Sequence, residues 1–395
     1  MGKHIGKSVK RVEDPRFIQG QGKYVANLKL PNMAHVAVLR SPHAHAKIKS
    51  INTDAAKAID GVIDVFIGQD LIDGGVGKMP VIWQVPDNKI PDRWPLVPDK
   101  VRHVGDSVAA VVAEDPYVAA DALELIEVDY EVLEATIGAK ATTEDGKPLV
   151  HDEIENNISF KWGLGDREAC DKAFEEADHV VKLDLINQRM IANAMEPRAC
   201  AAQWTAATKD MTVWTTSQNP HIIRFGLSAV TLPMLDEHKL RVISPDVGGG
   251  FGSKIFHYPE EVIVPWIAMK INRPCKWVAT RSESFMTDSQ GRDHVQKCKM
   301  ALKSDGTMTG LYAELHADMG AYLSSIAPLI PTVICITLFS GLYKNPGIWG
   351  ETTGTLTNTV PVDAYRGAGR PEASYLVERL VDVAAQELKM DPIEI

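Results

Sequence analysis

At 395 residues, with 45% hydrophobic and 24% charged side chains, the chain has the composition of a globular protein of two or three domains. Its formal net charge of −10 argues against a nucleic-acid partner, because affinity for a phosphate backbone needs clustered Lys and Arg. The five cysteines are scattered without a CxxC spacing, which argues against a zinc site or an iron–sulfur cluster in this chain and predicts reduced thiols in a cytoplasmic protein.

The first third of the chain alternates strand and helix patterns. The predicted strands are residues 33–41, 46–52, 62–68, 107–113 and 127–133. Thr53-Asp54 and Asp115-Pro116 carry helix-start signals between these strands. We therefore expect one compact α+β domain over residues 1–134, with an N-terminal arm, and a loose polar linker over 135–157.

Two histidines, His43 and His45, stand two positions apart, so on a strand their side chains would share one face. A metal site would need further ligands, and none follows nearby. A structural turn before a strand is the favoured interpretation, and a metal site is the alternative.

An uncharged segment covers residues 319–343. Pro328, Pro331 and several hydroxyl side chains interrupt it, which argues against a membrane span. We expect buried interior beside a ligand site.

Three polar loops stand out in the rest of the chain. "TTSQNPH" places Gln218 at the end of a predicted strand, "VGGGFGSK" follows another strand, and "AYRGAGRPE" leads into a helix with apolar residues at helical spacing. Closely spaced glycines let backbone N–H groups approach an anion. Each loop alone is more often structural, but loops of this kind could converge on one site.

The glycine-rich loop fits neither common nucleotide motif. Gly252-Ser253-Lys254 reverses the end of the Walker pattern, and glycines at 248, 250 and 252 have the wrong spacing for a dinucleotide fingerprint. A nucleotide-binding enzyme would also leave the other two loops unexplained.

Taken together, the three loops resemble the molybdenum-binding large subunit of the xanthine dehydrogenase, aldehyde oxidase and carbon monoxide dehydrogenase family, the molybdenum hydroxylases. Residues 6–48 and 101–131 resemble the α/β hammerhead domain of that family. The resemblance implies an α+β fold: a hammerhead domain over 1–134, a linker over 135–157, and the first molybdenum-cofactor-binding α/β domain over 158–395.

The resemblance also implies a cofactor, molybdenum on molybdopterin cytosine dinucleotide, that no protein side chain ligates. It suggests Gln218 and Arg366 as catalytic residues, with Gln218 hydrogen-bonded to the apical oxo group and Phe251 shielding one side of the cofactor. The residues expected to hold the cofactor, mainly through backbone N–H groups, are Gly249, Gly250, Phe251, Gly252, Arg366, Gly367 and Ala368.

The implied activity is oxidation of a carbon with oxygen derived from water, with electrons passed to [2Fe–2S] clusters and FAD on companion subunits. Purine-oxidising relatives have a glutamate at the position of Ile255 and an arginine at about the position of Ile334. Carbon monoxide dehydrogenases have a copper-binding cysteine at the position of Gly367. We therefore expect an aldehyde or N-heteroaromatic substrate in a pocket that includes Ile255 and Ala368. The alternatives are a carbon monoxide dehydrogenase-like subunit without the copper cysteine and a non-catalytic half-subunit.

Large subunits of this family are roughly twice this long. The glutamate that accepts a proton in the family's reaction lies in their second half, and no glutamate of this chain stands in a matching motif. Asp391-Pro392 repeats the helix-start signal, which predicts a further helix. We expect a second chain to supply the other half of the molybdenum subunit, beside an iron–sulfur subunit and an FAD subunit, with no nucleic acid and no membrane span.

Overall fold

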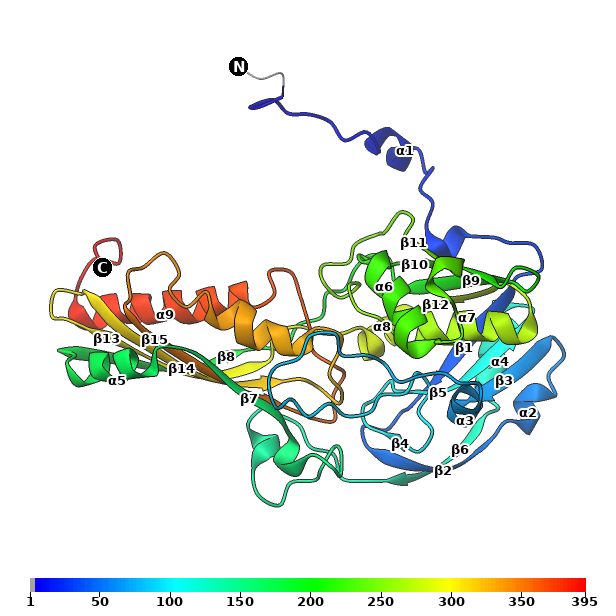
Figure 1. The fold of residues 1–395 in the computed structure, drawn as a ribbon, viewed down its shortest axis with the longest axis horizontal. Helices are drawn as coiled ribbons and strands as arrows, with labels where there is room; N and C mark the ends of the chain where they lie inside the picture. Colours follow the sequence, from blue (N-terminus) through cyan, green and yellow to red (C-terminus); the bar gives the residue numbers. More distant parts are fainter. Residues whose placement is uncertain (1–3) are drawn as a thin grey trace.

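The structure, a computed structural model, describes residues 4–395. The strands in these residues form three sheets (Figure 1). The largest has seven strands, in the order β11 (Leu240–Ile243), β10 (Asp210–Thr215), β9 (Ala199–Thr205), β12 (Cys275–Val278), β1 (Ala34–Arg40), β5 (Ser107–Ala113) and β3 (Val62–Ile67). The second has five, in the order β7 (Ile158–Gly165), β15 (Gly347–Thr355), β14 (Met308–Asp318), β13 (His294–Leu302) and β8 (His179–Asn187). The third joins β4 (Lys100–Val101), β2 (Ala46–Asn52) and β6 (Glu127–Val132).

Most of the helices pack on these sheets, whereas α1 lies on the N-terminal arm, apart from them (Figure 1). The α-helices are α1 (Asp14–Ile18), α2 (Asp54–Lys57), α3 (Gly68–Asp73), α4 (Pro116–Leu123), α5 (Arg167–Glu175), α6 (Pro220–Gly226), α7 (Glu260–Ile271), α8 (Arg281–Thr287) and α9 (Arg370–Leu388). Short 3₁₀ or π turns cover Val25–Asn27, Ala141–Thr143, Glu155–Asn157, Leu227–Thr231, Glu237–Lys239, Ala327–Leu329 and Ile330–Ile334. The strand predictions and the Asp115 cap are confirmed, since the Asp115 side chain accepts a hydrogen bond from the N–H of Tyr117 at 2.8 Å.

The largest sheet joins segments that are far apart in the sequence. Strand β1 pairs in parallel with β12, with Ala34 opposite Cys275, and pairs antiparallel with β5 on its other side. Val36 and Val38 of β1 belong to the same buried cluster as Trp266 of α7. The N-terminal strands therefore share a sheet and a buried core with later strands of the chain. The boundaries at 134 and 158 stay a prediction.

Residues 135–157 are packed and not loose. Val150 and Ile154 are buried in a cluster with Phe160. The side chain of Asn157 accepts from the N–H of Val150 and donates to the carbonyl oxygen of Thr142. Polar residues here bond one another inside the protein, which composition alone cannot distinguish from exposure to water.

The uncharged segment 319–343 is largely buried, and its two short turns lie next to the loop that precedes α9: a Cβ on Gly369 would lie 2.8 Å from the carbonyl oxygen of Ile330. Helix α9 lies along the five-stranded sheet (Figure 1). Its Leu376 and Leu380 belong to one buried cluster with residues of that sheet. No helix within residues 4–395 is both long and apolar enough to cross a membrane. At Asp391 the side chain caps a turn, accepting from the N–H of Ile393 at 2.8 Å, where a helix was expected.

Candidate functional site

The glycine-rich loop follows β11 and has an unusual backbone. Gly249 and Gly252 have φ of 99° and 103°, and Phe251 has φ of 53°, a left-handed conformation that costs a non-glycine residue about 1 kcal/mol. The N–H groups of Gly249, Gly250 and Phe251 donate to no acceptor among the described residues. Unpaired N–H groups on a turn of this kind are typical of a site for an anionic group.

Gln218 lies directly on this loop. Its side-chain Oε1 accepts from the N–H of Gly252 at 2.9 Å, and its main-chain N–H donates to the carbonyl oxygen of Lys254 at 2.7 Å. A Cβ added to Gly250 would lie 2.3 Å from Gln218 Oε1, so only glycine allows this contact. The Nε2 of Gln218 has no partner in residues 4–395 and remains available as a donor.

The loop before α9 meets the glycine-rich loop from the other side. The N–H of Arg366 donates to the carbonyl oxygen of Phe251 at 2.8 Å, and a Cβ on Gly252 would lie 2.5 Å from the carbonyl oxygen of Ala364. Gly367, Ala368 and Gly369 all have left-handed φ values, of 97°, 38° and 78°. The three loops singled out in the sequence therefore converge.

Not every residue expected to offer an N–H group does so. The N–H groups of Gly252, Arg366 and Ala368 already donate within the protein, whereas that of Gly367 has no partner in the part of the chain that the structure describes. The Arg366 side chain is exposed. The three bonded residues shape the loops, and the unpaired donors are at 249–251 and 367.

Buried charges that the sequence did not reveal hold the glycine-rich loop. The Lys254 ammonium, with a fully buried side chain, donates to the carbonyl oxygen of Glu196 at 2.7 Å and to its carboxylate at 3.2 Å. The same carboxylate accepts from the N–H of Gly248 at 2.7 Å. Burial lowers the pKa of Lys254, and the carboxylate opposes that shift.

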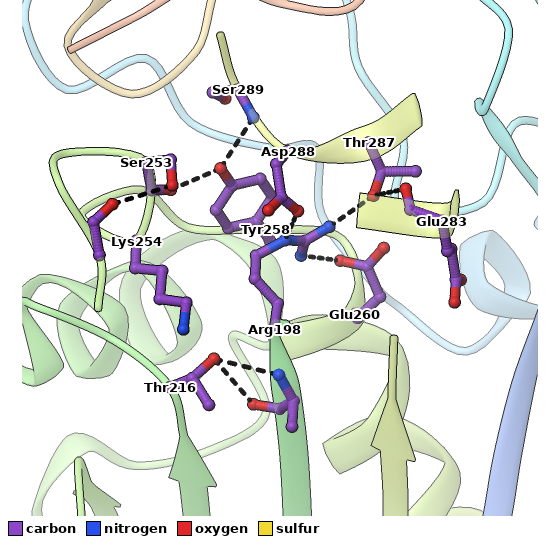
Figure 2. Close-up of polar contacts among 12 residues, drawn as sticks. Arg198, Thr216, Ser253, Lys254, Tyr258, Glu260, Glu283, Thr287, Asp288 and Ser289 are labelled. Atoms are coloured by element: carbon purple, nitrogen blue, oxygen red, sulfur yellow. Dashed lines mark hydrogen bonds and ion pairs between the residues drawn. The ribbon is translucent and has the colours of Figure 1, made fainter. Parts of the chain in front are cut away.

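A second buried cluster lies beneath the loops (Figure 2). The guanidinium of Arg198 stacks on the ring of Tyr258 at 3.7 Å and donates to Glu260 and Asp288, each at 2.6 Å. Burial alone would raise the pKa of Glu260, but the guanidinium groups of Arg198 and Arg40 outweigh it and hold that pKa well below its ordinary value.

The hydroxyl of Tyr258 connects two segments, as Figure 2 shows. It donates to the carbonyl oxygen of Ser253 at 2.5 Å and accepts from the N–H of Ser289 at 3.0 Å. The end of the glycine-rich loop is thereby connected to Ser289 through Tyr258.

A third buried pair supports the loop before α9. Arg292 donates to the carbonyl oxygens of Tyr365 and Arg366, at 3.1 and 2.9 Å, and to Glu372 Oε1 at 3.1 Å. Glu372 is fully buried and its Oε2 has no partner among the described residues. Burial raises the pKa of Glu372, and Arg292 opposes that shift.

Sequence reasoning missed the charged side chains among these supporting residues because the bonds of Lys254 to Glu196, Arg198 to its carboxylates and Arg292 to Glu372 join residues 58 to 90 positions apart, so no spacing marks them. Only Lys254 and Glu372 stand inside the quoted motifs, at the end of "VGGGFGSK" and of "AYRGAGRPE". Adjacency to a glycine turn was the one local signal for them.

The two residues expected in a substrate pocket, Ile255 and Ala368, pack against one apolar cluster. Ile330 and Phe256 are buried members of that cluster, and Ile334 packs against it as well. The neighbourhood of Ile255 and Ala368 is therefore apolar and lies directly beside both loops.

His43 and His45 form a turn. The N–H of His43 donates to Ser41 Oγ at 3.0 Å, and His45 Nδ1 lies 2.7 Å from the carbonyl oxygen of Glu134. Across residues 4–395, no group of three or more His, Cys, Asp or Glu side chains could hold a metal ion.

Two surface hollows, of about 530 and 390 Å³, lie on the five-stranded sheet, and Glu314 lines both. None of their lining residues belongs to the three loops. We place the candidate site at the loops because unpaired donors and buried charge pairs meet there.

Two family models match the chain. One, described as "Molybdopterin cofactor-binding domain", matches residues 150–395, and the other, "Aldehyde oxidase and xanthine dehydrogenase, a/b hammerhead domain", matches residues 19–134.

Relatives cover nearly the whole chain. The carbon monoxide dehydrogenase large chain of Afipia carboxidovorans is 35% identical over 99% of this chain and 49% of its own length. The nicotinate dehydrogenase large molybdopterin subunit of Eubacterium barkeri is 30% identical over 99% of this chain and 88% of its own. The crystal structure of quinoline 2-oxidoreductase from Pseudomonas putida 86 superposes with a TM-score of 0.93 at 33% identity, over 98% of this chain and 49% of that one. The chain thus spans about half the length of two of these proteins and most of the third.

Proposed function

The chain belongs to the aldehyde oxidase and xanthine dehydrogenase family of molybdenum hydroxylases, and from this premise we propose that it holds the molybdenum–molybdopterin cofactor of a multi-subunit oxidoreductase. One observation carries the proposal: three loops far apart in the sequence meet, and the N–H groups at 249–251 and 367 in them have no acceptor within residues 4–395. Because the chain spans 49% of the length of relatives such as the carbon monoxide dehydrogenase large chain, the activity of the complete enzyme is part of the proposal.

The residues fit an anionic, oxygen-rich cofactor. The unpaired N–H groups of Gly249, Gly250, Phe251 and Gly367 are its proposed hydrogen-bond donors. Gly252, Arg366 and Ala368 contribute by holding the two loops together and in shape. Phe251, with 42% of its surface exposed, is the proposed shield on one side.

Gln218 and Arg366 are the proposed catalytic residues. When bound, the cofactor supplies two-electron oxidation of a carbon with an oxygen atom from water. Gln218 Nε2 is the proposed side-chain donor to a cofactor oxygen, positioned because its Oε1 is bonded to Gly252. The main-chain N–H and carbonyl oxygen of Arg366 already bond Phe251 and Arg292, so its proposed catalytic contribution comes from its side chain, which is exposed.

The proposed substrate is an aldehyde or an N-heteroaromatic compound. Ile255 and Ala368 present apolar surface, which leaves the polar edge of a purine unpaired at a cost of about 1–3 kcal/mol for each missing contact. Two relatives carry the names of N-heteroaromatic substrates, nicotinate and quinoline.

A carbon monoxide dehydrogenase-like activity is the second candidate, favoured by 35% identity to such a large chain. Gly367 has no thiol to bind copper, and all five cysteines are free, buried and outside the loops. A copper site of that kind would therefore need a ligand from elsewhere.

We further propose that the cofactor is the cytosine dinucleotide form and that a second chain supplies the other half of its site. The 88% coverage of the nicotinate dehydrogenase subunit supports a molybdopterin subunit of about this length. [2Fe–2S] and FAD subunits complete the proposed complex, in the cytoplasm, where five free thiols stay reduced.

The test is purification of the native complex by a tag on this chain, followed by elemental analysis, release of the nucleotide and a dye-reduction assay. We expect molybdenum, cytosine monophosphate and turnover of an aldehyde or N-heteroaromatic compound. A complex without molybdenum refutes the proposal. Molybdenum without turnover of any such compound would favour a non-catalytic half-subunit, and turnover of carbon monoxide would favour the second candidate.

A further inference from the structure

Arg292 is the one described side chain whose guanidinium bonds both Tyr365 and Arg366 carbonyl oxygens of the loop before α9. It is buried, with 6% of its surface exposed, and its distances to these oxygens are 3.1 and 2.9 Å. A guanidinium offers its donors in a rigid planar fork, so two acceptors held together are fixed in relative orientation.

The bond to Arg366 determines where the next N–H group points. The peptide between Arg366 and Gly367 is planar and trans, so its N–H is directed opposite to its carbonyl oxygen. Because the oxygen is turned inward to the buried Arg292, the N–H of Gly367 is turned outward, and it has no acceptor among the described residues.

Without this bond the peptide would be free to rotate. Gly367 has φ of 97° and lies at an exposed position, and glycine accepts either orientation of the preceding peptide at little cost. The opposite orientation would present the carbonyl oxygen of Arg366 outward and repel an anionic ligand.

Arg292 is itself held in place. Glu372 Oε1 accepts from it at 3.1 Å, and the guanidinium carbon lies 4.9 Å from the centre of the Tyr365 ring. A Cβ on Gly291 would lie 2.3 Å from Cβ of Tyr365, so the segment that carries Arg292 is packed tightly on the loop.

We propose that Arg292, held by Glu372, is a positioning residue that aims the N–H of Gly367 at the bound cofactor. That the N–H of Gly367 contacts the cofactor rests on the proposed function, whereas the bonds of Arg292 to the loop do not.

The first experiment compares amide hydrogen exchange of residues 363–372 in the purified protein and in Arg292→Lys, which keeps the charge beside Glu372 but loses the fork. We expect the N–H groups of Arg366 and Ala368 to exchange about tenfold faster in the variant, because local opening of the loop becomes easier. The matched control is Arg40→Lys, because Arg40 is also a buried, carboxylate-bonded arginine but contacts neither loop; its partners are Glu260 and Glu283. Unchanged exchange in Arg292→Lys, or an equal increase in the control, overturns the proposal.

The second experiment uses the molybdenum-loaded complex. We expect Arg292→Lys to retain at least about half of the molybdenum, to lose turnover about tenfold with little change in KM, and to show an altered Mo(V) electron paramagnetic resonance signal, since one directed donor is lost. Glu372→Gln should move the same three readouts in the same direction by less, and it replaces Arg292→Lys if that variant does not fold. An unchanged signal with unchanged turnover overturns the proposal. A wild-type complex without molybdenum would refute the proposed function, while the exchange result would still decide the role of Arg292.

Discussion

At the scale of single residues, the two polar atoms of the Gln218 side chain, Oε1 and Nε2, have different roles. Its Oε1 accepts from the N–H of Gly252 and steadies the loop, whereas Nε2 has no partner among the described residues. Removing the side chain therefore affects both the loop and any ligand that Nε2 contacts.

We predict that Gln218→Ala lowers turnover about 100-fold, the usual range for loss of one positioned donor, while molybdenum content falls less than about twofold. Gln218→Glu keeps an acceptor for Gly252 but puts a carboxylate oxygen in place of the Nε2 donor, so it should lose turnover and, by repelling an anionic cofactor, retain less metal than Gln218→Ala. Elemental analysis and steady-state kinetics on both variants check this. Equal losses of metal and turnover in Gln218→Ala would assign Gln218 a structural role only.

His294 should make stability depend on pH. It is 1% exposed, its Nδ1 has no partner in the described chain, and burial, with a smaller contribution from Arg292, lowers its pKa from 6.5 to about 4. Between pH 6.5 and 4 the unfolded chain binds the proton and the folded one does not, so this stability is present above pH 6.5 and lost as pH falls towards 4. The loss is on the order of 3 kcal/mol.

The variant His294→Gln cannot titrate. We predict that its unfolding free energy, measured with urea at pH 7 and at pH 4.5, falls by less than that of the natural chain. His151, whose pKa burial lowers to about 3, titrates in both proteins and leaves this difference unaffected. An equal fall in unfolding free energy in the two proteins would show that His294 does not contribute to the pH dependence of stability.

At the scale of elements, the glycine-rich loop and the turn that carries Gln218 form one unit. Gly250 was expected to let the backbone approach the cofactor closely. In the structure the space beside Gly250 contains Gln218, with Oε1, Cδ and Cγ 2.3 to 2.8 Å from an added Cβ.

We predict that Gly250→Ala loses most of its molybdenum, because the added methyl group and the Gln218 side chain cannot occupy the same space and force the glycine-rich loop out of shape, a clash that Gln218→Ala does not create. The double variant Gly250→Ala and Gln218→Ala removes all three clashing atoms, so its metal content should return to that of Gln218→Ala. Metal analysis of the four proteins of this cycle is the measurement. If the double variant stays empty, the added methyl group meets something other than Gln218.

At the scale of the whole molecule, the seven-stranded sheet ties the N-terminal third to the rest. Removing residues 1–134 would delete β1, β5 and β3, and would expose β12 as a new edge with unpaired N–H and C=O groups. It would also uncover Trp266, which now packs on Phe66.

We predict that residues 158–395 expressed alone aggregate, and that co-expression with residues 1–157 restores a soluble complex. Size-exclusion chromatography and circular dichroism of both preparations test this. A monomeric 158–395 fragment with cooperative unfolding would establish it as an independent domain.

The sequence by itself determined the local features: the strand and helix order of the first third, the Asp115 cap, and the glycine turns, because alternation, capping and left-handed φ act within a few residues. It also identified the three loops, Gln218 and the family by resemblance. Only the tertiary structure decided that β1 pairs with β12, that residues 135–157 are packed, and that Lys254 bonds Glu196 and Arg292 bonds Glu372. Such pairings join residues 58 to 241 positions apart, and packing of the whole core, not any local pattern, brings them together.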